Sequence, residues 1–264
     1  MSNAIDSKTI YLYHDLMFYH EVEFNDEQNK FISDNFYELL IKSFNYGYIS
    51  FAGYLTTLYS QNKQINQEFL TDHTYQEKIF GRPLDVNLIF AECCKYCVYH
   101  KIDEKIANTI KLLYNSMKHE IDLQISFNEL CKFFDSYFSY ESKKIIDLIY
   151  NLSTDEHKPI DLHYNNEEPF ISCCENGNFC CAKYLYEKSI EEGNKINIFA
   201  QNHKAFITSC NNNFKKTIDW LCLICPDVYT YDHNNCSYEI HKSITENDNT
   251  TSIDELNKFY TIDI

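Results

Sequence analysis

The residues of this sequence whose types and spacing could do chemistry are its cysteines and histidines. Near the carboxyl end, two pairs at ligand spacing follow one another: Cys222, Cys225, His233 and Cys236. Thiolate sulfur and imidazole nitrogen in such pairs can hold a tetrahedral zinc ion. The alternative is structural, since Cys222 also falls on an expected helix whose packing accounts for it. We prefer the structural interpretation and predict no bound metal.

A second group of possible ligands lies earlier in the chain: Cys93, Cys94, Cys97 and His100. Residues three apart share a face of a helix, so this spacing suits a zinc site and a helix contact equally well. Apolar neighbours favour the contact between helices. We therefore expect these side chains to pack rather than to bind metal.

No pattern in the sequence indicates an enzyme. It contains no glycine-rich phosphate loop, no Gly-x-Ser-x-Gly and no His-Glu-x-x-His. The dipeptides Asp72-His73 and Asp232-His233 are typical of solvated loops. A cysteine nucleophile needs a neighbouring base to lower its pKa, whereas the apolar runs around these cysteines disfavour the thiolate. We predict no enzymatic activity and no cofactor.

The net charge of the chain restricts the classes of partner that it can bind. It has 23 basic and 39 acidic side chains, which gives a net charge of −16 at pH 7. Such an acidic chain repels a phosphate backbone, so we expect no nucleic-acid partner. The most apolar stretch, residues 87–99, contains Glu92 and Lys95 and is too short and too charged for a membrane span. A protein with a basic patch is the expected partner.

The cysteines also indicate a compartment. The first six residues lack the basic start and apolar core of a secretory signal, so we expect the twelve cysteines to be reduced and the protein to be cytoplasmic. Six of the twelve stand as adjacent pairs: Cys93-Cys94, Cys173-Cys174 and Cys180-Cys181. Adjacent pairs suit packing on helix faces better than a disulfide framework.

The elements that position these residues are expected to be helices. Hydrophobic residues make up 44% of the chain, enough for a packed core, while 5 Gly and 4 Pro are too few for the many turns of a β-sandwich or barrel. We predict an all-α fold of helices joined by short polar loops.

Internal repetition organises these helices. Residues 160–186 align without gaps on residues 196–222, an offset of 36. Two further apolar series keep this period: Ile110, Ile146, Ala182 and Ile218, and Leu113, Ile149, Leu185 and Leu221. A fifth copy is recognisable around residues 46–55. The sequence therefore predicts about five repeats of 36 residues.

Each repeat is predicted to form two short helices. In the fourth copy, Pro169 suits a helix start, Phe170 begins an apolar stripe and Gly177 suits the left-handed residue that ends a helix. Phe179 and Leu185 then mark the apolar face of the second helix. Because one such pair cannot bury both of its apolar faces, neighbouring copies must stack into a solenoid.

These units resemble degenerate ankyrin repeats. Glu168-Pro169-Phe170-Ile171 stands where that family has Thr-Pro-Leu-His, Cys173-Cys174 where it has Ala-Ala, and Ile196-Asn197-Ile198 at its β-finger. The amino-acid sequence of the repeat is similar to that of ankyrin proteins of giant DNA viruses of amoebae. The Thr and His of the family motif are absent, which leaves open how hydrogen bonds join one repeat to the next.

The resemblance implies an organisation into segments. We expect an N-terminal cap at 1–34, repeat 1 at 35–60, an insertion at 61–86, repeat 2 at 87–120, repeat 3 at 121–158, repeat 4 at 159–195, repeat 5 at 196–230, and a C-terminal cap or tail at 231–264.

It also implies a function: a non-enzymatic scaffold that binds another protein through the concave face lined by finger loops and first helices. Matching positions place eight residues on that face: Asn165, Asn166, Glu167, Glu168, Gln201, Asn202, His203 and Lys204. Two other functions stay open. One is a virion or assembly component that binds copies of itself. The other is an adaptor for host ubiquitin machinery, although no F-box pattern follows Tyr231. The expected location is then host cytoplasm or virion.

Overall fold

The computed structural model describes residues 6–19, 24–61, 86–134 and 139–241 of the 264. Asp72-His73, the interior of the predicted insertion and the tail after His241 lie outside the described residues. The described chain is mostly helical, as its composition predicts. Its helices are α1 (Ser7–Tyr19), α2 (Asp26–Asp34), α3 (Phe36–Asn45), α4 (Ile49–Gln61), α7 (Val86–Cys97), α8 (Glu104–Met117), α9 (Leu123–Phe133), α10 (Ser139–Asp155), α11 (Tyr164–Glu175), α12 (Phe179–Glu191), α13 (Ala200–Asn211) and α14 (Lys215–Ile224).

The chain divides into two compact units. Unit 1 comprises Met1–Leu130 and Lys144–Ile160, and unit 2 comprises Cys131–Lys143 and Asp161–Ile264. Helices α9 and α10 each contribute residues to both units. The sequence pattern did not predict this division.

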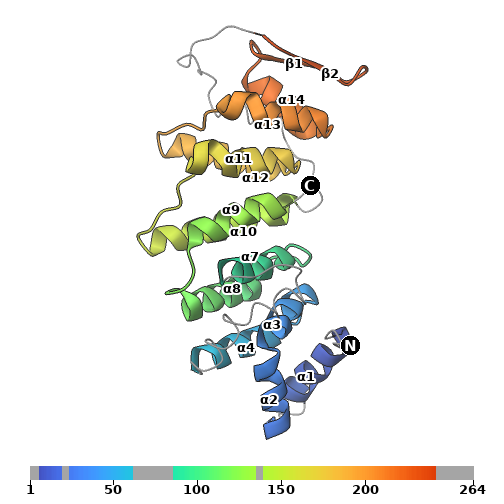
Figure 1. The fold of residues 1–264 in the computed structure, drawn as a ribbon, viewed down its shortest axis with the longest axis vertical. Helices are drawn as coiled ribbons and strands as arrows, with labels where there is room; N and C mark the ends of the chain where they lie inside the picture. The colour runs from blue at the N-terminus through green and yellow to red at the C-terminus, as the bar shows by residue number, and fades with distance from the viewer. Residues whose placement is uncertain (1–5, 20–23, 62–85, 135–138, 242–264) are drawn as a thin grey trace. The chain divides into compact units, whose positions relative to one another are not determined.

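Unit 1 contains two stacked helix pairs. Helix α3 packs on α4 and α7 on α8, while α3 also lies against α7 and α4 against α8 (Figure 1). Each helix therefore has one face against its own partner and one against the next pair, as burial of two apolar faces requires. Helices α1 and α2 pack against α3. The core includes Leu40, Phe44, Phe51, Phe90 and Leu113.

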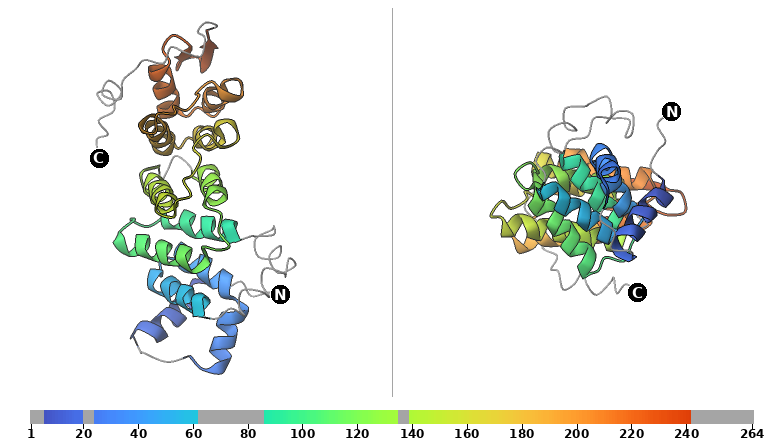
Figure 2. Two further views of the ribbon diagram at one scale, coloured as in Figure 1. Left: turned by 90° about the vertical axis from the view of Figure 1, so that its left-hand side faces the viewer. Right: turned by 90° about the horizontal axis from the view of Figure 1, so that it is seen from below.

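Unit 2 repeats this packing. Helix α11 packs on α12 and α13 on α14, and α11 lies against α13; the left view of Figure 2 shows these yellow and orange helices nearly end on. Trp220 of α14 lies at the centre, with its ring centroid 5.5 Å from that of Tyr186 and 5.8 Å from that of Phe179. Leu185 and Leu221, which the repeat pattern equates, are both fully buried.

A β-hairpin follows α14 at the end of unit 2. Strands β1 (Tyr229–Asp232) and β2 (Ser237–Ile240) pair in antiparallel fashion (Figure 1). The all-α prediction did not include this hairpin. Tyr229 explains its position, because its ring stacks on Phe206 of α13 with centroids 4.0 Å apart.

The turns between paired helices use left-handed residues, as predicted. Gly177 ends α11 with φ of +69°, and a Cβ built there would lie 2.5 Å from Cδ1 of Phe214. One repeat later Asn213 takes the same conformation with φ of 55°. The Phe214 ring therefore excludes a side chain at residue 177, and glycine also adopts the left-handed conformation without the cost that an L-residue such as Asn213 bears.

Within the described residues, no helix combines the length and the apolar character needed to cross a membrane.

Candidate functional site

Two left-handed turns begin the first helices of the last two repeats in unit 2. Each has three consecutive residues with φ between 50° and 69°: Asn165, Asn166 and Glu167, and 36 residues later Gln201, Asn202 and His203. A left-handed conformation costs an L-residue about 1–2 kcal/mol, and runs of three without glycine are rare. Right-handed helix follows each turn, and Pro169 lies just inside the start of the first, as predicted.

Hydrogen bonds between repeats hold the two turns together. Gln201 Nε2 donates to the carbonyl oxygen of Asn166 at 3.0 Å and lies 3.4 Å from that of Asn165. The side chain of one turn thereby satisfies the backbone of the turn before it. The sequence had left open which hydrogen bonds join one repeat to the next, and the bond from Gln201 to Asn166 is one of them.

Glu167 also joins one repeat to the next. The expectation that its side chain projects towards a partner is wrong. Its side chain is 7% exposed. Its Oε1 accepts a hydrogen bond at 3.0 Å from the N–H of Asn197 in the loop before α13, and it lies 2.9 Å from Nδ1 of His163. A carboxylate buried in this way is stabilised by its partners, which explains why it faces inwards.

His163 extends this network to the turn that follows α12. Its Nε2 lies 2.8 Å from the carbonyl oxygen of Asn194, so a doubly protonated ring donates to both Glu167 and Asn194. Burial alone would lower the pKa of His163, but the hydrogen bond and charge of Glu167 and the Asn194 carbonyl raise it overall. His163 and Glu167 thus join the start of α11 to Asn194 and Asn197 in the loop between α12 and α13.

The next position of each repeat carries a charge that is already paired. Glu168 lies 3.1 Å from Nζ of Lys132 on α9, and Lys204 lies 3.1 Å from Oε1 of Glu175. The amide of Asn165 also donates to Glu168. This hydrogen bond and the contact with Lys132 lower the pKa of the Glu168 carboxyl, and they outweigh partial burial, which would raise it. Glu168 and Lys204 are equivalent by sequence and opposite in charge, so this surface is not uniformly acidic.

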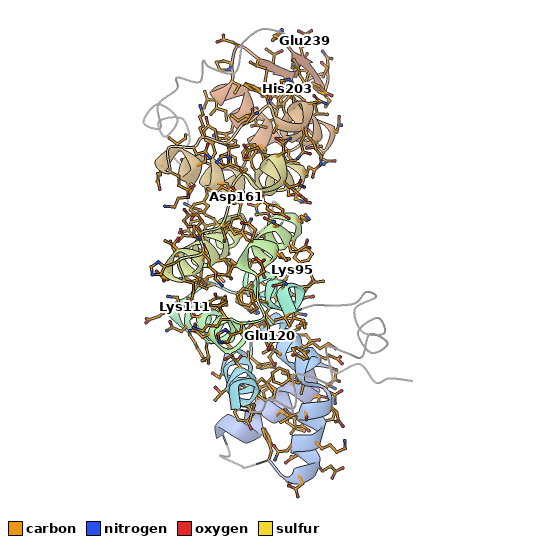
Figure 3. All side chains as sticks on the ribbon, turned by 60° about the vertical axis from the view of Figure 1, so that its left-hand side comes forward. Lys95, Lys111, Glu120, Asp161, His203 and Glu239 are labelled. Atoms are coloured by element: carbon orange, nitrogen blue, oxygen red, sulfur yellow. The ribbon has the colours of Figure 1, made fainter. Side chains whose placement is uncertain are left out.

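The side chains that reach solvent are mainly amides. Asn165, Asn166 and Asn202 are exposed, while Gln201, His203 and Lys204 are half-buried. His203 lies below the hairpin that carries Glu239 (Figure 3), and its Nδ1 is 2.9 Å from the hydroxyl oxygen of Tyr229. Burial lowers the pKa of His203, which favours the neutral ring. The equivalent Asn166 and Asn202 are therefore the pair presented most openly.

The structure does not bring the candidate zinc ligands together. Cys225 is buried, Cys236 is exposed, and His233 instead lies 2.6 Å from Oδ1 of Asp219. Burial, with a smaller contribution from Asp219, raises the pKa of Cys222 to about 11. Among the residues that the structure describes, no three His, Cys, Asp or Glu side chains have the arrangement of a metal site.

The earlier group packs between helices. Cys93, Cys94 and Cys97 are buried in α7, where burial raises the pKa of each thiol. His100 reaches the end of α3, with Nε2 3.1 Å from the carbonyl oxygen of Phe44 and 3.2 Å from that of Asn45. This ring therefore caps a helix of the preceding repeat.

Three further thiols meet in the core of unit 2. Hydrogen bonds from Cys131 and Cys181 lower the pKa of Cys173, while burial raises the pKa of those two neighbours. All three side chains are 0% exposed. The sequence contained the pair Cys173-Cys174 but no signal for this meeting of three helices. A substrate has no path to these sulfurs, so the cluster belongs to the packing.

Two hollows in unit 1 contain none of the predicted site residues. One of about 580 Å³ lies over the start of α8 and is lined by Asp103, Glu104, Lys105, Asn108, Thr109 and Leu112. A second of about 280 Å³ lies between residues 121–124 and 158–160. Neither gathers a nucleophile with a base.

Comparison of the chain with protein-family models, with curated proteins and with solved structures finds no match.

Proposed function

We propose that this chain is a non-enzymatic protein-interaction scaffold of the ankyrin-repeat type, similar to those of giant DNA viruses of amoebae. It binds a protein partner through the two left-handed turns of unit 2. The observation that carries the proposal is the recurrence of this turn, 36 residues apart, with an exposed asparagine at the same position of each.

The strain in these turns supports a role in binding. Six non-glycine residues with positive φ cost several kcal/mol together, and such strain persists where the surrounding structure over-determines it. Gln201, Glu167 and His163 supply that support through hydrogen bonds. A surface fixed in advance loses little conformational entropy when a partner docks.

Amide groups determine the chemistry of recognition on this surface. The charges of Glu168 and Lys204 are matched by Lys132 and Glu175, so they do not attract a partner of one sign. Asn166 and Asn202 each offer a donor and an acceptor to a partner's backbone or polar side chains. Long-range attraction to a basic partner comes instead from the net charge of −16.

The test removes these amides without disturbing the turns. Asn166→Gly with Asn202→Gly deletes both side chains, and glycine adopts the left-handed conformation freely. A partner is first purified with the full chain from the cell that produces it and identified by mass spectrometry. We expect the double variant to bind the purified partner at least about tenfold more weakly, with unchanged circular dichroism.

A control pair lies on α12 of the same unit. Lys188 and Glu191 form a surface ion pair at 2.8 Å, and replacing both with alanine should leave binding unchanged. Equal affinities of the amide variant and the wild type would contradict a role of the turns. Loss of binding on removal of residues 62–85 alone would assign the function to that segment instead.

A further inference from the structure

The register of the hairpin shows which backbone groups face away from it. His241 N–H donates to the Val228 carbonyl oxygen at 2.9 Å, and the same register pairs Thr230 with Glu239 and Tyr231 with Tyr238. Hydrogen-bonded and non-hydrogen-bonded pairs alternate in an antiparallel ladder. The N–H and C=O groups of Tyr238 and Ile240 therefore point away from β1, along the outer edge of β2.

This edge is open in the described part of the chain. Residues 237–239 are exposed and Ile240 is half-buried. The corresponding edge of β1 is occupied at Tyr229, whose N–H donates to the Cys225 carbonyl oxygen at 3.0 Å. An exposed edge strand is a template on which another strand can pair.

The two faces of the hairpin differ in chemistry. On the inner face the Tyr238 ring meets Phe206 edge to face, with centroids 5.7 Å apart. On the outer face Glu239 lies 3.9 Å from Nε2 of His241, which also contacts the Thr230 hydroxyl at 3.2 Å. Glu239 itself is largely exposed to solvent, with 78% of its side-chain surface accessible.

We propose that the free edge of β2 binds an extended segment of a partner protein in which a basic residue lies between two apolar residues. The added strand pairs with the outward N–H and C=O groups of Tyr238 and Ile240. Its basic residue lies beside Glu239 on the outer face, and the flanking apolar residues extend the inner layer formed by Tyr238 and Phe206. This surface is distinct from the exposed amides Asn166 and Asn202 of the left-handed turns.

A second copy of the chain fits this edge poorly. Two β2 strands that pair through both outward residues, Tyr238 of one with Ile240 of the other, place their Glu239 side chains directly opposite each other. Like charges in that position destabilise a strand pair. A basic segment replaces this repulsion with attraction, which is why we assign the edge to a partner of opposite charge.

The test uses the full chain and a fluorescently labelled, capped peptide, Ser-Thr-Val-Lys-Val-Thr-Ser. Fluorescence anisotropy measures its affinity, and amide hydrogen exchange followed by NMR reports on Tyr238 and Ile240. We expect the peptide to slow exchange at both amides. A peptide with glutamate in place of lysine should bind at least about fivefold more weakly.

Two variants test the geometry. Ile240→Pro removes an outward N–H that the hairpin does not use, so the strand pair should survive while peptide affinity falls about tenfold or more. Ile240→Val keeps that N–H and should bind as the wild type does. Glu239→Lys should reverse the preference, so that the glutamate peptide binds more tightly than the lysine peptide.

Four results would overturn the proposal. They are equal affinity for the lysine and glutamate peptides, unchanged binding by Ile240→Pro, slow exchange at both amides before peptide is added, and dimers in sedimentation that Ile240→Pro dissolves. The third result would show that the chain covers its own edge, and the fourth would make a second copy the occupant. Asn166→Gly with Asn202→Gly should leave peptide binding intact, which separates this test from that of the proposed function.

Discussion

Gly177 is a position where a side chain would be strained in two ways. Its φ is +69°, and a Cβ would lie 2.5 Å from the Phe214 ring of the next repeat. We expect Gly177→Ala to lower the free energy of unfolding by at least about 1–2 kcal/mol, measured by urea denaturation. Gly53→Ala is the matched control, since Gly53 lies inside α4 with nothing near its Cβ position, and it should raise stability by about 0.5–1 kcal/mol. Equal effects of the two changes would contradict this account.

The pairing of His163 with Glu167 makes stability depend on pH. The folded protein raises the pKa of His163 above its ordinary value, so the charged ring contributes stability that is present below about pH 6.5 and is lost as pH rises through the folded pKa. Unfolding in urea between about pH 6 and pH 8.5 should show this loss in the wild type.

His163→Gln is the comparison for that titration. The variant should lack the part of the pH dependence that His163 contributes, and the histidine C–H signals in NMR should give a pKa above the ordinary value for this ring. Identical pH profiles for the two proteins would show that the pair contributes nothing to folding.

At the scale of the element, the helix pair is the packing unit. Leu185 of α12 is 0% exposed, and Leu185→Ala leaves a cavity that should cost about 2–5 kcal/mol. Trp220 of α14 is the single tryptophan of the chain. It packs against Tyr186, which lies on α12 next to Leu185, so its fluorescence reports on unfolding of unit 2. We expect a large shift of that transition in the variant.

Hydrogen exchange shows whether this damage is local. Repeats are coupled through neighbours, so amides of α11 to α14 should lose protection while those of α3, around Leu40, retain it. Equal loss of protection in both regions would contradict stacking by nearest neighbours.

At the scale of the whole molecule, the number of cysteine thiols that react with a reagent reports on folding. All twelve are free, nine are buried, Cys180 and Cys222 are half-buried and Cys236 is exposed. Titration with a thiol reagent under native conditions should modify Cys236 first and leave the nine buried thiols slow, whereas denaturant should release close to twelve. Mass spectrometry after a short labelling pulse identifies the modified residue, and rapid labelling of Cys173 would contradict its burial.

Much of the architecture was readable from periodicity. The period of 36 predicted the burial of Leu185 and Leu221, and the sequence also predicted the left-handed Gly177 and the helix start at Pro169. Periodicity reports which side chains share a face, but it carries no information on the pairing of polar groups. The inward orientation of Glu167 depends on His163, four residues earlier, and on the N–H of Asn197, 30 residues later. The spacing of four is a local signal for the first contact, but no spacing in the sequence indicates the second.

The left-handed turns and the hairpin had local sequence signals, but other features of the sequence favoured different predictions. Asn165, Asn166 and Asn202 are of a residue type that tolerates the left-handed region, but the resemblance to an ankyrin finger predicted only that their side chains face a partner. Alternating aromatic and β-branched residues around Asn234-Asn235 are typical of a hairpin, but low glycine and proline content favoured helices throughout. The division into two units depends on how α9 and α10 pack, which the repeat register does not reveal.

The left-handed turns have a consequence for synthesis with mirror-image amino acids. The conformation that costs an L-residue about 1–2 kcal/mol is the favoured helical region of a D-residue. Asn166 and Asn202 have φ of 58° and 57°, so D-asparagine placed there by chemical ligation should stabilise the fold, whereas the same exchange inside the right-handed part of α11 should disrupt it. A chain built from residues of one chirality therefore contains two short stretches that chemically prefer the other.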